Sequence, residues 1–151
     1  MKTLKLKNDS IVQIYNLLEK IPMRGAASRG KTKLQKRLQE KESEYLSEKS
    51  EIQKEYTQLD EDGNFITLDD GVSSPLKEGL TLEDKEKFLA RIDELQKDTF
   101  EISFSEYSDK FEQMFKALSV LDMELIKEAA LAYDELMDAY EANEDKNEEE
   151  K

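Results

Sequence analysis

Hydrophobic and polar residues alternate in two short stretches of the chain, residues 2–7 and 99–104. A period of two predicts a β-strand with one buried face. The residues expected on the buried faces are Leu4 and Leu6, then Phe100, Ile102 and Phe104. Polar residues and an amphipathic segment follow each strand. This shared plan fits a duplicated strand–helix unit or two independent units, and we expect both strands in one small sheet.

Four segments carry apolar residues at every third or fourth position, which predicts amphipathic helices. They cover roughly residues 10–21, 81–95, 105–118 and 122–140. The expected N-caps are Asn8, Asp9 or Ser10, then Thr81, then Ser105 or Ser108, and Asp122. Thr81 and Asp84 form an acidic variant of the capping box. The second helix is expected to bury Leu82, Phe88, Leu89, Ile92 and Leu95.

One long helix is predicted from about Ser28, because residues 31–59 contain neither Pro nor Gly. Its apolar residues are sparse, and Leu38, Tyr45 and Ile52 recur at intervals of seven. This spacing is half of a heptad seam. We expect the narrow stripe to pack on one partner element, within the chain or between chains. The stripe favours a homo-oligomer, most simply a dimer.

The expected fold class is α+β and mostly helical. One long helix and three to four shorter helices would pack on a small sheet, with a β-hairpin at residues 56–68 around Asp62-Gly63. Residues 1–140 are expected to form a single domain. Residues 141–151 are almost entirely charged, which predicts a disordered acidic tail.

Composition limits what the core can contain. The apolar fraction is 37% and the charged fraction 39%, against about 45–50% and about 25% in ordinary domains. The core must therefore be thin. The net charge of −13 is uneven, with +8 on residues 1–37 and −21 on residues 38–151. The basic end can pair with acidic residues of its own or a neighbouring chain, while the acidic bulk argues against nucleic acid as a partner.

The chain contains neither Cys nor His. Their absence excludes disulfides, thiol nucleophiles, imidazole bases and the usual zinc ligands. Together with the thin core, this favours a binding protein without a cofactor over an enzyme. The sequence shows no signal-peptide pattern and no apolar run of about 18 residues. These features predict a cytoplasmic protein that does not contact a membrane.

Four residues match the spacing of a phosphate-binding loop, G-x-x-x-x-G-K-[ST]: Gly25, Gly30, Lys31 and Thr32. In such a loop, backbone N–H groups hold the phosphates, the lysine reaches the β/γ oxygens and the hydroxyl holds Mg²⁺. The motif requires a buried strand that leads into its first glycine. Here an amphipathic helix and Pro22 precede the glycine, so nucleotide binding is the weaker interpretation.

The same region, residues 23–37, is basic and lacks acidic residues. Its cations are Arg24, Arg29, Lys31, Lys33, Lys36 and Arg37. They can contact phosphate or nucleic acid, or pair with acidic residues elsewhere. No aromatic residue lies in the segment to stack on bases, so ion pairing is the preferred interpretation. These cations, with the stripe residues Leu38, Tyr45 and Ile52, form the predicted partner-binding set.

Acidic residues suggest two further sites. A calcium loop beginning at Asp60 would have Gly at its sixth and Glu at its twelfth position, where this chain has Phe65 and Gly71. A hairpin turn is therefore preferred there. The acidic faces and tail could imitate the phosphates of DNA and occupy a basic cleft. Solubility is the preferred explanation for their charge.

Two long stretches together resemble one family. They read LKLKNDSIVQIYNLLEKIPMRGAASRGKTKLQKRL and FEISFSEYSDKFEQMFKALSVLDMELIKEAALAYDELMDAYE. They are similar to a family of uncharacterised small proteins encoded by tailed phages and prophages of Gram-positive bacteria. The resemblance implies a phage origin, and a location in the cytoplasm of an infected or lysogenic host or in the virion. It supplies no functional residues.

The expected function is non-catalytic binding of another protein. The chain would act as a phage accessory or assembly factor, or as a binder of a phage or host protein. The first alternative is an acidic inhibitor that imitates DNA and blocks a host nucleic-acid enzyme, against host defence. The weaker alternative is a nucleotide binder that uses the phosphate-loop motif.

Overall fold

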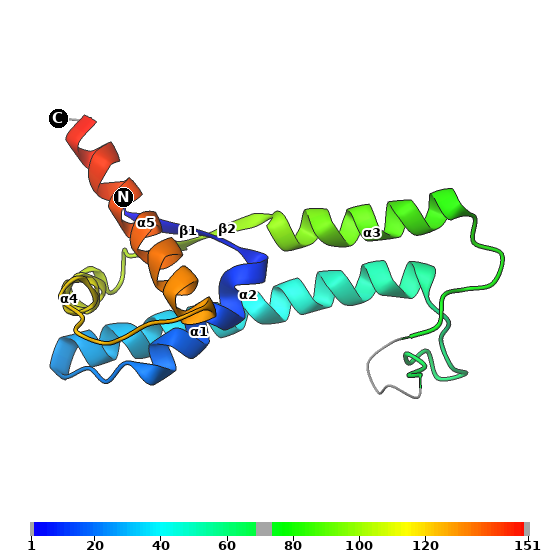
Figure 1. The fold of residues 1–151 in the computed structure, drawn as a ribbon, viewed down its shortest axis with the longest axis horizontal. Coiled ribbons are helices and arrows are strands. Elements are labelled where there is room, and N and C mark those ends of the chain that lie inside the picture. Colours follow the sequence, from blue (N-terminus) through cyan, green and yellow to red (C-terminus); the bar gives the residue numbers. More distant parts are fainter. Residues whose placement is uncertain (1, 69–73, 150–151) are drawn as a thin grey trace. The chain divides into compact units, whose positions relative to one another are not determined.

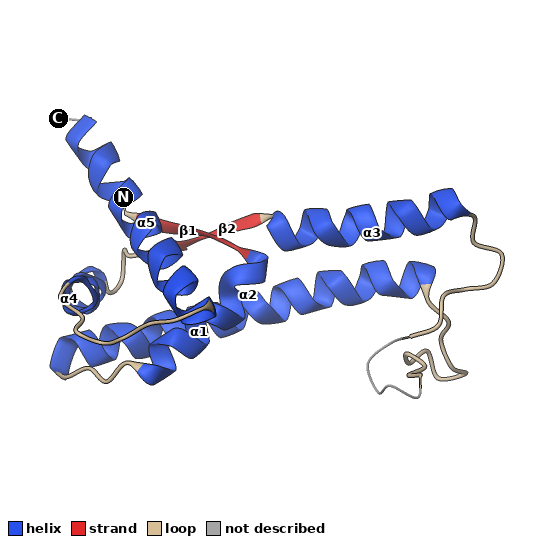
Figure 2. Ribbon diagram, in the orientation of Figure 1, coloured by secondary structure: helices blue, strands red, loops and turns tan. Residues whose placement is uncertain are grey.

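The computed structural model describes residues 2–68 and 74–149 of the chain. In these ranges it contains five α-helices, one short 3-10 helix and one two-stranded sheet (Figures 1 and 2). The elements are β1 (Thr3–Lys7), η1 (Asn8–Ser10), α1 (Ile11–Lys20), α2 (Gly25–Tyr56), α3 (Leu82–Lys97), β2 (Thr99–Ser103), α4 (Ser108–Ser119) and α5 (Glu128–Glu149). The predicted class, α+β and mostly helical with one long helix, is confirmed.

The chain divides into two compact units. The first contains residues 1–42 and 98–151, and the second contains residues 43–97. The helix α2 runs from the first unit into the second. The single-domain boundary predicted for residues 1–140 stays a prediction.

The sheet joins the two predicted strands, as expected. β1 and β2 are antiparallel, with Leu4 opposite Ile102 and Leu6 opposite Phe100 (Figure 2). Backbone hydrogen bonds continue the ladder at both ends, from Phe104 N–H to the Lys2 carbonyl and from Asn8 N–H to the Asp98 carbonyl. The alternating pattern places the apolar side chains on the buried face, while the residues between them face outward.

The hydrophobic core lies in the first unit. Seventeen buried side chains form one cluster: Leu4, Leu6, Ile11, Ile14, Leu17, Leu18, Ile21, Leu34, Leu38, Ile102, Phe104, Phe111, Met114, Phe115, Leu118, Ala132 and Leu136. Aromatic rings fill its centre, with Phe115 stacked on Tyr140 at 4.1 Å between ring centroids and Phe104 5.0 Å from Phe111. Apolar residues at helical spacing in the first, third and fourth predicted short helices, such as Ile14, Phe111 and Leu136, lie in this cluster, as their amphipathic pattern requires.

Gly30 allows α2 and α4 to cross closely. A Cβ atom at this position would lie 2.2 Å from the carbonyl oxygen of Lys110 and 3.1 Å from the Cβ of Met114. No side chain fits at 2.2 Å from a backbone oxygen, so the crossing requires glycine. This contact fixes the basic segment of α2 beside the N-terminal end of α4.

A polar network ties three elements of the first unit together. Lys2 Nζ donates to Glu112 of α4 at 2.7 Å, and the hydroxyl of Tyr140 of α5 donates to the same carboxylate. The ammonium of Lys2 also lies 5.8 Å from the Tyr140 ring centroid. Burial alone would raise the pKa of Glu112, but the hydrogen bonds from Lys2 and Tyr140 lower it by more, so the net pKa falls below its ordinary value.

The second unit combines the C-terminal part of α2 with α3. The ring of Phe88 lies 5.0 Å from that of Tyr56, and Arg91 forms an ion pair with Glu55. The predicted capping box at the start of α3 is confirmed. Thr81 N–H donates to the Asp84 carboxylate at 3.0 Å, and Asp84 N–H donates to the Thr81 hydroxyl at 3.1 Å. These bonds hold the pKa of Asp84 below its ordinary value.

Two predicted features of the second unit hold only in part. The hairpin expected at residues 56–68 is a turn closed by a single antiparallel bridge, between Leu59 and Phe65. The carboxylate of Asp60 accepts backbone N–H groups from Asp62 and Asn64 and keeps this turn short. In α3, Leu82 and Leu89 were expected to be buried but are 73% and 66% exposed. The C-terminal part of α2 therefore covers only part of the apolar stripe predicted for α3.

The starts of two helices in the first unit also differ from the prediction. The last helix was expected to begin at Asp122, but α5 begins at Glu128, after an extended loop. Neither Ser105 nor Ser108 caps α4, whose N-cap is Tyr107 without a side-chain hydrogen bond.

The backbone of α5 is helical to Glu149, whereas the composition predicts a disordered tail from residue 141. Disorder of that tail in solution stays a prediction.

None of the helices within the described ranges has both the length and the apolar character of a bilayer-spanning helix.

We predict that Gly30→Ala destabilises the protein. At a helix position with free space around it, this change stabilises the folded protein by about 0.5–1 kcal/mol, because alanine loses less backbone entropy on folding than glycine does. Here the new methyl group meets the Lys110 carbonyl, so a loss of about 1–3 kcal/mol is expected. Urea unfolding followed by circular dichroism measures the change. Thr32→Ala, at an exposed position of the same helix, is the control, and a stabilised Gly30→Ala protein would contradict the crossing.

We also predict a pH-dependent loss of stability in Glu112→Gln. The folded-state pKa of Glu112 is lowered, so its contribution is fully present above the ordinary pKa of about 4.3 and disappears as the pH falls through the folded value. The variant should melt at a lower temperature than the wild type at neutral pH, and the difference should shrink below about pH 4. Glu141→Gln, at an exposed position of α5, should show no such difference.

Candidate functional site

The phosphate-loop motif is not a loop in the structure. Its residues, Gly25 to Thr32, form the first turns of α2, and no strand leads into them. Lys31 does not face an open anion site, because its Nζ donates to the carbonyl of Ile21 at 2.8 Å. That carbonyl lies at the C-terminal end of α1, so Lys31 caps a helix. The geometry therefore lacks the backbone cradle on which nucleotide binding by this motif depends.

The basic segment separates into distinct environments. Arg24, Arg29 and Lys36 are exposed. Lys33 places its Nζ 3.9 Å from the centroid of the Tyr107 ring. Arg37 pairs with Glu40 and Glu106 across 3.4 and 3.6 Å.

A small basic hollow lies where α2 meets the start of α4. It has a volume of about 210 Å³ and is lined by Lys33, Lys36, Arg37, Glu40 and Tyr107. The Nζ of Lys110 lies 5.6 Å from the Tyr107 ring and adds a further cation nearby. Tyr107 is the aromatic residue that the basic segment itself lacks. Sequence reasoning missed it because the helix crossing at Gly30 brings it from a distant part of the chain.

The predicted partner-binding stripe is only partly available. Leu38 is completely buried in the core of the first unit, so its assignment as a partner contact is wrong. Tyr45 and Ile52 lie in the second unit and are half-buried.

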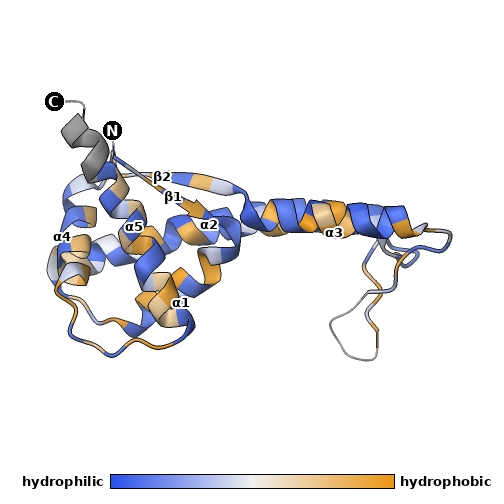
Figure 3. Cartoon of the chain, turned by 45° about the horizontal axis from the view of Figure 1, so that its top comes forward, coloured by the Kyte–Doolittle hydropathy of each residue, from blue (hydrophilic) through white to orange (hydrophobic). Residues whose placement is uncertain are grey.

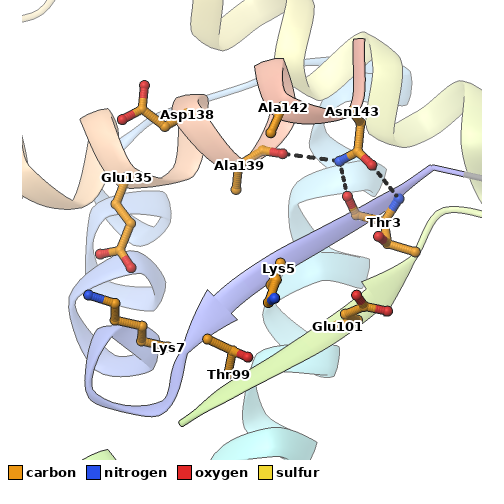
Figure 4. A pocket seen from close by; sticks show the side chains of 10 residues that line it. All are labelled: Thr3, Lys5, Lys7, Thr99, Glu101, Glu135, Asp138, Ala139, Ala142 and Asn143. Atoms are coloured by element: carbon orange, nitrogen blue, oxygen red, sulfur yellow. Dashed lines mark hydrogen bonds between the residues drawn. The ribbon is translucent and has the colours of Figure 1, made fainter. Parts of the chain in front are cut away.

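A polar groove lies beside β1 and α5 (Figure 4). It has a volume of about 430 Å³, and its lining includes Lys5, Lys7, Glu101, Glu135 and Asp138. Cations and carboxylates therefore share the same walls. The Ser10 hydroxyl lies 2.7 Å from both carboxylate oxygens of Glu135, which holds that side chain in place. In the described part of the chain, no group of three or more acidic side chains is arranged as metal ligands.

One end of this groove is closed by an amide that imitates a strand. Asn143 of α5 accepts a hydrogen bond from Thr3 N–H at 3.1 Å and donates to the Thr3 carbonyl (Figure 4). These are the backbone groups that a third strand would use. Since an open sheet edge promotes unwanted pairing, Asn143 protects this end of β1.

Among the described residues, ten large apolar side chains are exposed, and four of them lie in the loop between α4 and α5 and the first turn of α5. Parts of this loop have the orange of hydrophobic residues in Figure 3. Val120, Met123, Ile126 and Leu131 are 42–77% exposed, and we call residues 120–131 the apolar segment. Residues between them, Leu121 and Leu125, pack against the core.

The backbone of the apolar segment is held at both ends. At its start, the Leu121 N–H donates to the Leu118 carbonyl at 3.2 Å, and the Tyr133 hydroxyl donates to the same carbonyl at 2.6 Å. At its end, Lys127 adopts a positive φ of 53°, which is uncommon for a residue with a side chain, and turns the chain into α5. The exposed side chains are thus presented by an anchored backbone.

We predict that Lys31 acts in stability and not in nucleotide binding. Lys31→Ala should lower the melting temperature, because the Ile21 carbonyl loses its donor. ATP or GTP with Mg²⁺ at millimolar concentration should leave the melting temperature of the wild type unchanged, since a bound ligand would raise it. Thermal melts measure both effects. A nucleotide-dependent rise that Lys31→Ala abolishes would restore the phosphate-loop interpretation.

Comparison with known proteins identifies the family. Neither a curated protein nor a solved structure matches the chain significantly. One family model matches residues 2–149, nearly the whole sequence, and is described as a protein of unknown function (DUF1617). The match includes both strands and all five helices of the described structure. The chain therefore belongs to the DUF1617 family.

Proposed function

We propose that this protein is a non-catalytic, phage-encoded interaction protein that binds another protein through the apolar segment. The apolar segment is the observation that carries the proposal. In a chain with only 37% apolar residues, four large apolar side chains remain in water on one loop and the helix turn that follows it. These four side chains lie within twelve residues of the chain, and exposed apolar side chains that gather in one patch typically mark an interaction site.

The construction of the segment supports this proposal. Its inward residues are fixed in the core and its backbone is hydrogen-bonded at Leu118, so little conformational entropy has to be lost on binding. Acidic residues flank the apolar side chains, namely Asp122, Glu124 and Glu128. A polar rim around an apolar centre is the usual anatomy of a protein interface.

The phage setting of the proposal comes from the sequence resemblance. In that setting the partner is a phage structural or assembly protein, or a host protein, and the protein acts in the host cytoplasm or in the virion. The predicted dimer makes a second copy of this chain another candidate partner for the same segment.

The test compares two double variants with matched exposure. Ile126→Ser with Leu131→Ser removes two side chains of the apolar segment that are 64% and 72% exposed. Leu82→Ser with Leu89→Ser removes two from α3 that are 73% and 66% exposed. We expect the first variant to lose a partner that the wild type and the second variant both retain. The readouts are cross-linking and mass spectrometry in phage-infected cells, and light scattering for self-association.

The outcomes are distinct. A phage or host protein lost only with the apolar-segment variant supports the proposal, as does an oligomer that dissociates only in that variant. Equal retention of every partner by both variants, with a wild-type protein that is monomeric, contradicts it. Thermal melts of both variants show whether a loss of binding reflects unfolding instead.

A further inference from the structure

We propose that the basic hollow and the adjoining face of α2 bind the phosphate backbone of a nucleic acid. The site consists of Arg29, Lys33, Lys36 and Arg37 of α2, with Lys110 of α4. This activity is separate from protein binding by the apolar segment, and its evidence does not depend on that proposal.

The cations of α2 lie on one face of the helix. Residues three, four, seven and eight apart are neighbours on a helix surface, and Arg29 and Lys33 have these separations from each other and from both Lys36 and Arg37. Lys36 and Arg37 are consecutive and lie at the two edges of this face. At about 1.5 Å per residue, the row from Arg29 to Arg37 is about 12 Å long. That length exceeds what a single phosphate group needs. A chain of regularly spaced phosphates can contact the whole row.

Most of these cations are not neutralised by the acidic residues whose side chains the structure describes. The sequence contains 36 acidic residues, yet Arg29, Lys33, Lys36 and Lys110 form no ion pair with any described residue. Only Arg37 is paired, with Glu40 and Glu106 at 3.4 and 3.6 Å. Both contacts are long and exposed, so their contribution is small. Of the six cations in the basic segment, Arg37 is the one that forms the expected ion pair with acidic residues in the described part of the chain.

Tyr107 organises the site. Its ring is 3.9 Å from the Nζ of Lys33 and 5.6 Å from the Nζ of Lys110, which attracts both ammonium groups to the rim of the hollow. The crossing at Gly30 fixes the helix that carries Tyr107 against the helix that carries the row. Lys33 and Lys110 are thus held in place before a ligand arrives, which reduces the entropy lost on binding.

The net charge of the whole chain determines how tightly nucleic acid is expected to bind. A net charge of −13 repels nucleic acid at long range, so binding should be weak at physiological salt and tighter at low salt. For single strands, each neutralised phosphate contributes about −0.7 to the slope of log K against log salt. Three to four contacts predict a slope between about −2 and −3.

The test measures fluorescence anisotropy of a labelled oligonucleotide of mixed sequence, single-stranded and as a duplex, at about 50 and about 200 mM NaCl. Arg29→Gln with Lys36→Gln removes two exposed cations of the row without disturbing the core. Lys54→Gln with Lys85→Gln removes two exposed cations of the second unit and is the charge-matched control. Inorganic phosphate is added in a separate titration at constant ionic strength.

We expect the row variant to weaken binding about tenfold or more at low salt and to reduce the slope by about 1.4, while the control variant binds as the wild type does. The Ile126→Ser with Leu131→Ser variant should also bind as the wild type. No binding of either oligonucleotide at low salt, or equal weakening in the row and control variants, would overturn the proposal. Complete displacement by inorganic phosphate would overturn it as well, because the site would then take a single phosphate group.

Discussion

The antiparallel pairing of β1 with β2 is the interaction on which the first unit depends. It places Leu4 and Leu6 beside Ile102 on one buried layer, although the two strands are far apart in the sequence. Each strand leads into a helix that supplies the same core, β1 into α1 and β2 into α4. Closing so long a loop costs little more entropy than closing a shorter one. The chain can therefore bring its few apolar residues together in one cluster. Residues 43–97, which lie between the two strands in the sequence, form a separate unit.

This concentration explains where the two proposed binding surfaces lie. The apolar segment and the basic hollow both lie in the first unit, where the core anchors the backbone that presents them. The second unit is held by contacts that remain partly exposed, such as the ring of Phe88 on Tyr56 and the ion pair of Arg91 with Glu55. Exposed ion pairs contribute little to stability. The second unit therefore depends on few buried side chains, such as Leu95 and Thr57, together with half-buried ones.

Local patterns predicted the elements well, because strand alternation, helix periodicity and the Thr81 capping box are properties of neighbouring residues. Local patterns did not predict which apolar helix faces would be covered by another element. Leu89 is exposed although its spacing matches that of a buried face. Such patterns also did not predict the role of Gly30, which allows a close helix crossing although its spacing matches a phosphate loop. The proximity of Tyr107 to Lys33 follows from that crossing and has no local signal.

Native-state amide hydrogen exchange tests most directly whether one strand-closed core dominates stability. Amides of Leu4 and Ile102 should exchange only through global unfolding, whereas those of α3 should exchange through openings of lower free energy, with a smaller dependence on denaturant. Protection of α3 equal to that of the sheet, or exchange of the sheet before α3, would contradict the account.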